Sequence, residues 1–310
     1  MRVFITGGSG QLGRAICSAL LERGDEVVVL TRDLDKARKV LSTKVELIEG
    51  DPCYEVAGWQ SQLAGFDAVI SLAGEPMDGQ NWDARFRQVL HDSRIDSTRY
   101  LAEGILKLAE ADRPKVFVAT SSVNYYSFAE IEMFDDDEFD EAATGGETFL
   151  SYLCWDWEDE TKCLEPDIRV VTMRLGTVLG PRTRAFKQLC APFSVGIGGP
   201  IGKGRQWLSW VHIADVAGAY LHAIDSELQG PVNLVSPGAV RSSEMAQALG
   251  NVLGKRSWFR TPGFVVRRRM GALSEYVLKG RQAVPKALIE SGYEFKYPDV
   301  EPALRELTKR

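Results

Sequence analysis

Histidine and closely spaced cysteines are scarce in this chain of 310 residues. It has three histidines and five cysteines, and no two cysteines form a CxxC pair. Zinc sites and disulfide frameworks depend on such residues at short spacing, so the sequence indicates no metal site. The odd number of cysteines without a pairing pattern instead indicates a reducing compartment.

Long apolar runs and a surplus of positive charge are also missing. No apolar stretch approaches the roughly 18 residues of a membrane-spanning helix. The strand-like run 2–5 follows Met1 at once, which leaves no room for a charged leader segment. The net charge is -6, which favours neither nucleic acid nor an anionic membrane as a partner. The sequence therefore predicts a cytoplasmic protein whose partner is a small molecule.

What the chain does have is a regular alternation of two patterns. Short runs rich in β-branched residues alternate with segments in which apolar residues recur at helical spacing, such as 12–23 and 96–111. This alternation is typical of βαβ units, so we expect an α/β protein with a Rossmann-type doubly wound parallel sheet. The expected strands are 2–6, 26–31, 45–48, 67–72, 115–120 and 169–174.

The second part of the chain has a different texture. Residues 196–202 are rich in glycine, and the helical segments after residue 242 are not separated by strong strands. We therefore expect a smaller, mostly helical C-terminal substrate lobe. The expected division is a Rossmann domain at 1–178, completed by about 208–235, and a substrate lobe with a C-terminal extension at 179–207 and 236–310.

A glycine-rich loop directly follows the first expected strand and opens a helix. Its glycines have GxxGxxG spacing, which allows a tight turn, close approach of a pyrophosphate and close packing of helix on strand. The helix N-terminus would then bind the phosphates, the alternative being a turn without a ligand. The residues expected to contact a dinucleotide here are Gly7, Ser9, Gly10, Gln11, Leu12 and Gly13.

Arg32 lies at the end of the second strand, about 20 residues after the glycines, where the ribose selector of such domains belongs. A guanidinium there binds the 2′-phosphate of NADP, whereas a carboxylate binds the ribose hydroxyls of NAD. Arg32 therefore favours NADP(H). Asp33, the next residue, keeps NAD(H) as the less favoured alternative, and an ordinary exposed arginine is a third interpretation.

Two more strand ends complete the expected crevice at the carboxyl edge of the sheet. Asp51 follows the third strand and could accept a hydrogen bond from the adenine amine. The fourth strand is followed by residues that let the backbone pass close to the ribose and diphosphate. These residues are Leu72, Ala73, Gly74 and Glu75.

With these motifs in place, the chain resembles the extended short-chain dehydrogenase/reductases. It is most similar to their atypical subgroup, named epimerase family or nucleoside-diphosphate-sugar epimerase proteins, including the small C-terminal extension of that subgroup. The resemblance covers essentially the full length and implies an NADP(H)-binding Rossmann fold. The segments that carry it are ITGGSG at 5–10, LAGEP at 72–76, SR at 93–94, WE at 157–158, GGPIG at 198–202, WVHI at 210–213 and GRQAVP at 280–285.

The resemblance also implies a catalytic set that this chain keeps only in part. In the wider family a serine orients the substrate, a tyrosine moves a proton, and a lysine four residues later lowers the pKa of the tyrosine. The resemblance places Ser122 on the serine, but Leu150 on the tyrosine and Cys154 on the lysine. A substitute proton carrier would be Tyr125 or Tyr126, unless these tyrosines are structural.

Further site residues are implied on the cofactor and substrate sides. The cofactor contacts implied by the resemblance are Thr120, Arg174, Gly176 and Val178. The side chains expected to receive an anionic or ring-bearing substrate are Arg182, Phe186, Lys203 and Trp207. We interpret His212 as a structural histidine and Asp215 as the cap of the following helix.

Two functions follow from these observations. The first is an NADP(H)-dependent oxidoreductase or epimerase-like enzyme that acts on an unidentified small molecule through Ser122 and Tyr125. The second is a sensor or scaffold that binds the dinucleotide without turnover, which the missing tyrosine and lysine favour. Because family relatives often pair through helices on one face of the sheet, a homodimer is also expected.

Overall fold

The computed structural model describes residues 1–54, 58–77, 82–128 and 137–309, and the chain divides into two compact units. The first unit comprises Met1–Tyr125, Tyr152–Arg174 and Val216–Val232. The second comprises Tyr126–Ser151, Leu175–Asp215 and Asn233–Arg310. The chain therefore crosses between the units several times.

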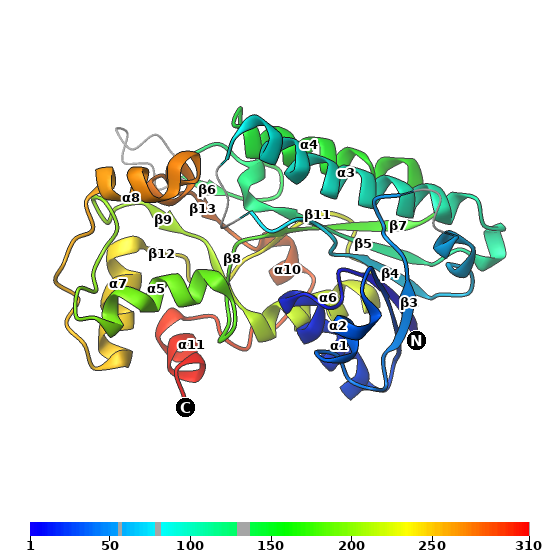
Figure 1. Ribbon diagram of the computed structural model, residues 1–310, viewed down its shortest axis with the longest axis horizontal. Coiled ribbons are helices and arrows are strands. Elements are labelled where there is room, and N and C mark those ends of the chain that lie inside the picture. The colour runs from blue at the N-terminus through cyan, green and yellow to red at the C-terminus, as the bar shows by residue number, and fades with distance from the viewer. Residues whose placement is uncertain (55–57, 78–81, 129–136, 310) are drawn as a thin grey trace. The chain divides into compact units, whose positions relative to one another are not determined.

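A seven-stranded sheet organises the first unit (Figure 1). Its order is β11-β7-β5-β4-β1-β2-β3, and the pairs β1·β2, β1·β4, β2·β3 and β4·β5 are parallel. This order continues the 3-2-1-4-5-6 order of Rossmann domains, which confirms the expected α/β fold. The strands are β1 (Arg2–Thr6), β2 (Glu26–Thr31), β3 (Glu46–Glu49), β4 (Ala68–Ser71), β5 (Val116–Ser122), β7 (Arg169–Leu175) and β11 (Gly230–Leu234).

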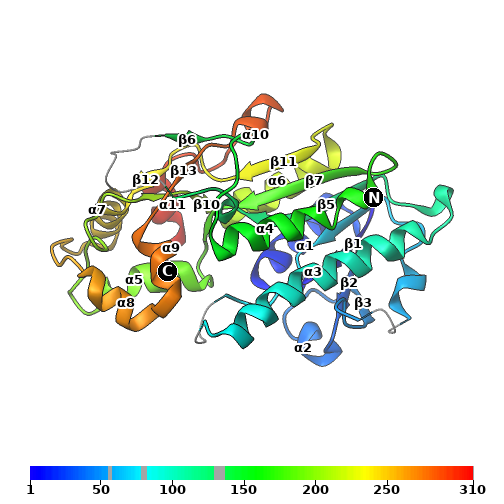
Figure 2. The ribbon, with the colours of Figure 1, turned by 90° about the horizontal axis from the view of Figure 1, so that it is seen from above.

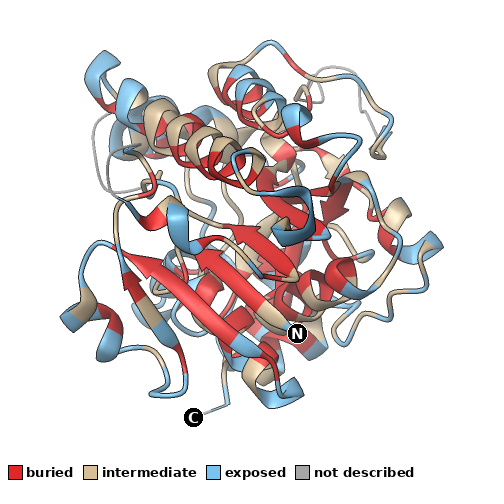
Figure 3. Ribbon diagram, turned by 90° about the vertical axis from the view of Figure 1, so that its right-hand side faces the viewer, coloured by how far each residue is buried: buried red, intermediate tan, exposed pale blue. Residues whose placement is uncertain are grey.

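Helices cover both faces of this sheet, which is why its central strands are apolar along nearly their whole length. Helices α3 (Ala84–Leu106) and α4 (Phe149–Asp159) lie on one face, and α1 (Gln11–Arg23) and α6 (Ile213–Asp225) lie on the other (Figure 1). The central strands are accordingly almost entirely buried, whereas the edge strand β3 has two exposed residues (Figure 3). The carboxyl ends of the strands, where parallel sheets bind ligands, are thereby held in fixed register.

The second unit is built from short strand pairs and helices, which Figure 2 shows from above. Its paired strands are β8 (Thr177–Leu179) with β10 (Trp210–His212), β9 (Trp207–Leu208) with β12 (Val240–Arg241), and β6 (Glu138–Phe139) with β13 (Gln282–Ala283). Its helices are α5 (Arg184–Ser194), α7 (Ser242–Leu253), α8 (Gly263–Met270), α9 (Ser274–Leu278), α10 (Lys286–Glu290) and α11 (Val300–Leu307). This composition agrees with the expected mostly helical lobe.

Two features of the described residues bear on the kind of site to expect. None of the helices in this part of the chain is both long and apolar enough to cross a membrane. No group of three or more histidine, cysteine, aspartate or glutamate side chains in it is placed to hold a metal ion.

Candidate cofactor and active site

The glycine-rich loop after β1 is packed so tightly that side chains would not fit. Gly7 has φ +71°, and a Cβ on it would lie 2.8 Å from the carbonyl carbon of Leu72. A Cβ on Gly13 would lie 2.4 Å from the Cα of Gly8. These glycines therefore bring β1, the loop and α1 into the close approach that a pyrophosphate-binding turn requires.

The N-terminus of α1 is open to an anion. Gly10 is the N-cap residue in extended conformation, no side chain caps the helix there, and the first turn has no acidic residue. Gly10 and Gln11 are exposed, so this helix end, whose first N–H groups have no partner within the helix, is accessible to a ligand. Together with the helix dipole, these groups suit a phosphate, and Ser9 and Leu12 lie in the same loop.

At the end of β2, the structure separates the roles of Arg32 and Asp33. The Asp33 carboxylate accepts a hydrogen bond of 2.9 Å from the backbone N–H of Lys36 and so caps α2 (Leu34–Arg38). The side chain of Arg32 is 70% exposed, and its Nη1 lies 3.9 Å from Oδ2 of Asp51. The carboxylate that would favour NAD is thus used within the protein, whereas the guanidinium remains at the surface beside Asp51.

Residues 72–75 after β4 are held from two sides. The Leu72 N–H donates to the backbone oxygen of Thr6 in β1, and Ser93 Oγ accepts from the Glu75 N–H at 3.0 Å. The Arg94 guanidinium donates to the Glu75 carbonyl, also at 3.0 Å. The backbone of Ala73 and Gly74 between these anchors is therefore fixed at the carboxyl edge of the sheet.

The end of β5 distinguishes the two candidate tyrosines. Tyr126 is fully buried, and its hydroxyl donates to Oδ1 of Asn233 at 2.7 Å, so it is a structural tyrosine. Tyr125 is only partly buried and follows Ser122 by three residues. The Oγ of Ser122 accepts hydrogen bonds from the N–H and the side-chain amide of Asn124, at 3.2 and 3.0 Å. Ser122 and Tyr125 thus remain the candidate catalytic pair.

A buried ion pair lies beneath Tyr125. Arg174 donates from Nε and Nη2 to both carboxylate oxygens of Glu158, at 2.9 and 2.7 Å. Glu158 also accepts a 2.6 Å hydrogen bond from Ser121 Oγ. The guanidinium of Arg174 lies 3.5 Å from the centre of the Tyr125 ring. Arg174, expected as a cofactor contact, is therefore seen here in an ion pair that supports the Tyr125 ring.

Leu150 and Cys154, which the resemblance places at the usual tyrosine and lysine, cannot take over the functions of those residues. Leu150 is buried, and its side chain has no ionisable proton. Cys154 is 3% exposed, and burial raises the pKa of its thiol to about 12. At neutral pH Cys154 is therefore a neutral thiol, and its Sγ donates a hydrogen bond of 3.8 Å to the carbonyl oxygen of Ser122.

The remaining predicted cofactor residues lie in different settings. The Thr120 hydroxyl is buried and lies 2.7 Å from both the carbonyl of Ser71 and the hydroxyl of Tyr220. Gly176 and Val178 belong to the second unit, at β8. A Cβ on Gly176 would lie 2.6 Å from the carbonyl oxygen of Ser209, so glycine is required there by packing.

The predicted substrate residues all lie in the second unit, and they divide by exposure. Arg182 and Lys203 are exposed, whereas Phe186 is 6% exposed and packs in a core cluster with Trp210 and other apolar residues. Trp207 is partly buried, with the guanidinium of Arg241 4.4 Å from its ring centre. Phe186 thus has the position of a core residue.

His212 and Asp215 contact the C-terminal segment through their side chains. The Nε2 of His212 lies 3.0 Å from a carboxylate oxygen of Glu306, its Nδ1 accepts from the N–H of Ala214, and burial lowers its pKa. His212 is structural, as expected. Asp215 was expected as a helix cap, which is wrong, because α6 already begins at Ile213. Its buried carboxylate instead accepts hydrogen bonds from the backbone N–H groups of residues 296 and 297.

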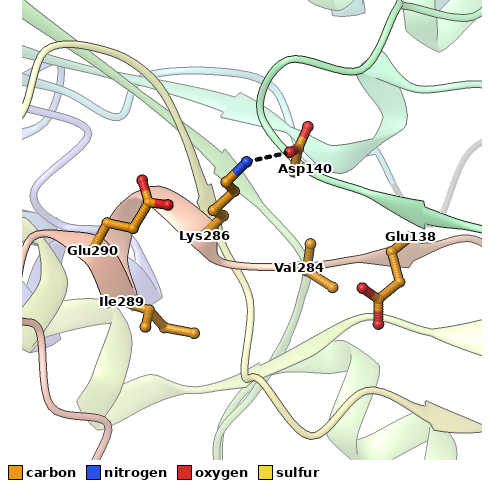
Figure 4. Close-up of a pocket in the computed structure, with 6 residues that line it drawn as sticks. All are labelled: Glu138, Asp140, Val284, Lys286, Ile289 and Glu290. Atoms are coloured by element: carbon orange, nitrogen blue, oxygen red, sulfur yellow. Dashed lines mark hydrogen bonds and ion pairs between the residues drawn. The ribbon is translucent and has the colours of Figure 1, made fainter.

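A cavity of about 480 Å³ is lined by residues of β6, β13–α10 and their flanking segments (Figure 4). The Lys286 Nζ lies 3.0 Å from Oδ2 of Asp140, so the ammonium group in it is already paired. None of the predicted site residues lines this cavity. Its lining residues are Glu138, Asp140, Val284, Lys286, Ile289 and Glu290.

Comparison with family models assigns the chain to a class that agrees with this geometry. Residues 3–235 match the NAD dependent epimerase/dehydratase family, and residues 261–307 match the domain of unknown function DUF1731. The chain therefore belongs to the NAD dependent epimerase/dehydratase family. The combination with DUF1731 is consistent with the atypical extended short-chain dehydrogenase/reductase subgroup.

Individual relatives cover nearly the full length. The mouse epimerase family protein SDR39U1 is 34% identical over 311 residues, covering 99% of both chains. YfhF, an epimerase family protein of Bacillus subtilis, is 32% identical over 309 residues and is covered to 98%. A crystal structure of human SDR39U1 with NADPH superposes with a TM-score of 0.85 at 30% identity, covering 99% of each chain.

Sequence reasoning gave no role to Arg94 or Glu158, which the structure places beside the candidate site. Both lie in short motifs, SR and WE, that carried the family resemblance. That resemblance was the available signal. The partners of these two side chains follow only from the way in which α3, α4 and β7 pack together in the fold.

Proposed function

We propose that the first unit binds NADP(H), with the pyrophosphate at the N-terminus of α1 and the 2′-phosphate at Arg32. The observation that carries this proposal is the use of Asp33 as the cap of α2, which leaves a guanidinium at the tip of β2. The NADPH-bound crystal structure of the human relative supports the same cofactor. NAD(H) is the less favoured alternative.

The proposed reaction is an oxidation, reduction or epimerisation of an unidentified small molecule. Bound NADP(H) supplies the hydride chemistry. Ser122 orients the substrate, and Tyr125 carries the proton that the missing tyrosine would otherwise carry. The support for Tyr125 is its partly exposed ring, held against Arg174 directly after the end of β5.

The second unit is proposed to contribute substrate recognition. Arg182, Lys203 and Trp207 supply cationic and aromatic groups suited to an anionic or ring-bearing substrate, whereas Phe186 packs in the core of this unit. The backbone at Gly176 and Val178 is proposed to lie next to the nicotinamide ring. The corresponding domain division is nucleotide binding in 1–178, completed by 208–235, and substrate recognition in the remainder.

A sensor or scaffold that binds the dinucleotide without turnover is a second candidate function. It is favoured by Leu150 and by the neutral thiol of Cys154, which together remove the usual route for proton transfer.

The two candidates are separated by incubating the purified protein with NADPH or NADP and a panel of carbonyl compounds and sugar nucleotides. We expect a change in absorbance at the reduced-nicotinamide band that is lost in Tyr125→Phe. Tight NADPH binding without turnover of any compound would instead support the sensor.

A homodimer and a cytoplasmic location remain predictions. The dimer is supported by exposed apolar side chains on the α3–α4 face, namely Val89, Tyr152 and Trp155. Light scattering of the purified protein tests it, and Trp155→Glu should shift a dimer toward monomer.

A further inference from the structure

Arg94 is a buried cation that forms no ion pair within the described part of the chain, although the negative charge of Glu75 favours its charged form. The residue is 8% exposed, and its guanidinium donates 3.0 Å hydrogen bonds to the backbone oxygens of Leu90 and Glu75. Burial lowers the pKa of Arg94 to about 10, so the group still carries its charge at neutral pH. A buried charge of this kind is costly unless something compensates it.

The position of Arg94 relates it to the missing lysine. Its guanidinium lies 5.3 Å from the centre of the Trp157 ring on α4. Cys154 precedes Trp157 by three residues, so the two side chains share one face of that helix. Arg94 and Cys154 are also close enough to influence each other's ionisation. The positive charge therefore faces the side of α4 that carries Trp157 and Cys154, although it comes from α3.

Arg94 also fixes the backbone where the cofactor is proposed to pass. Its Nη2 donates to the carbonyl of Glu75, and the preceding Ser93 accepts from the N–H of the same residue. A Cβ on Gly74 would lie 3.3 Å from the Cγ of Arg94, so the segment packs directly on this side chain.

We propose that Arg94 provides the fixed positive charge that a lysine at position 154 would provide, and that it is a positioning residue for the cofactor along residues 72–75. This inference rests on the proposed cofactor function. In this proposal the positive charge is supplied by α3, whereas the usual family pattern supplies it from α4.

A charge-relocation cycle tests the proposal with Arg94→Met, Cys154→Lys and the double variant. Thermal unfolding of the cofactor-free proteins is the first measurement. Cys154→Lys should lower Tm strongly while Arg94 is present, because two buried cations then face each other. In the Arg94→Met background the Tm loss caused by Cys154→Lys should fall to half or less. Equal losses in both backgrounds would overturn the proposal.

NADPH affinity, followed by the fluorescence of the reduced nicotinamide, is the second measurement. Arg94→Met should weaken binding about tenfold or more, because a charged hydrogen-bond donor is lost. The double variant should regain at least about threefold of that loss, and Arg94→Lys should bind more tightly than Arg94→Met. Unchanged affinity in Arg94→Met, or no recovery in the double variant, would contradict the proposal.

Arg99→Met is the matched control, since Arg99 lies on the same helix but is only partly buried and is paired with Glu160. It should leave NADPH affinity unchanged. If the unaltered protein binds neither NADPH nor NADH, the proposed function fails, and the unfolding cycle alone then decides whether Arg94 stands in for the lysine charge.

Discussion

The guanidinium of Arg174 lies 3.5 Å from the centre of the Tyr125 ring. Two hydrogen bonds to Glu158 fix that guanidinium in turn, so the orientation of Tyr125 depends on an ion pair between β7 and α4. The proposed proton carrier therefore has a rigid support, although the residues of the usual catalytic pair are missing.

Breaking this ion pair should lower the stability of the protein. Glu158→Gln leaves the buried Arg174 without a counter-charge, and we expect a loss of about 3 kcal/mol or more in the free energy of unfolding. Urea denaturation measures it. The double variant Glu158→Gln/Arg174→Met, which removes both charges, should be more stable than the single variant. A single variant as stable as the unaltered protein would contradict the role given to this pair.

Gly13→Ala should abolish tight cofactor binding, because the new Cβ would meet the Cα of Gly8 at 2.4 Å and displace the loop. We expect NADPH affinity to fall at least about tenfold, measured by fluorescence titration. Ser18→Ala, at an exposed position of the same helix, is the control and should bind normally. If the alanine at position 13 is tolerated without loss of affinity, the pyrophosphate does not bind at this loop.

Arg32→Asp tests the cofactor preference. The substitution removes the proposed 2′-phosphate contact and places a negative charge at the same point, so NADPH should be weakened far more than NADH. Parallel titrations with both cofactors provide the measurement, and Arg38→Ala on α2 is the control. Equal losses for both cofactors would refute Arg32 as the selector.

Acid should destabilise the protein in part through His212. Burial lowers the pKa of His212 in the folded state below its unfolded value of about 6.5, so the unfolded chain binds a proton first as the pH falls. The contribution is present above about pH 6.5 and is lost as the pH falls through the lower, folded pKa. Thermal unfolding is measured between about pH 8 and pH 5, a range that spans the unfolded pKa of about 6.5. The Tm of His212→Asn should depend less on pH than the Tm of the unaltered protein. An unchanged pH dependence would contradict this role.

The sheet was largely predictable because its signals are local. Strands 2–6 and 26–31 were predicted with the bounds of β1 and β2, since each is a continuous apolar run between turn residues. Helix α3 begins at Ala84 instead of the predicted 96, because Asp83 caps a polar first part whose apolar periodicity is weak. Asp83 is an N-cap signal in the sequence, which apolar periodicity alone does not include.

The side-chain network around the site was less predictable because its contacts are distant in sequence. The sequence predicts Asp215 as a local helix cap, but its carboxylate accepts hydrogen bonds from the backbone N–H groups of residues 296 and 297. The contact of Arg94 with Glu75 and that of Glu158 with Arg174 likewise depend on how strands and helices assemble. Periodicity identifies which face of a helix is buried, but it does not identify the partner of a buried charge.

Calorimetric titration of the unaltered protein with NADPH and with NADH tests the central claim most directly. With a pyrophosphate at α1 and a 2′-phosphate at Arg32, both cofactors should release or absorb heat, and NADPH should bind at least about tenfold more tightly. The absence of a heat signal with either cofactor, or tighter binding of NADH, would contradict the account.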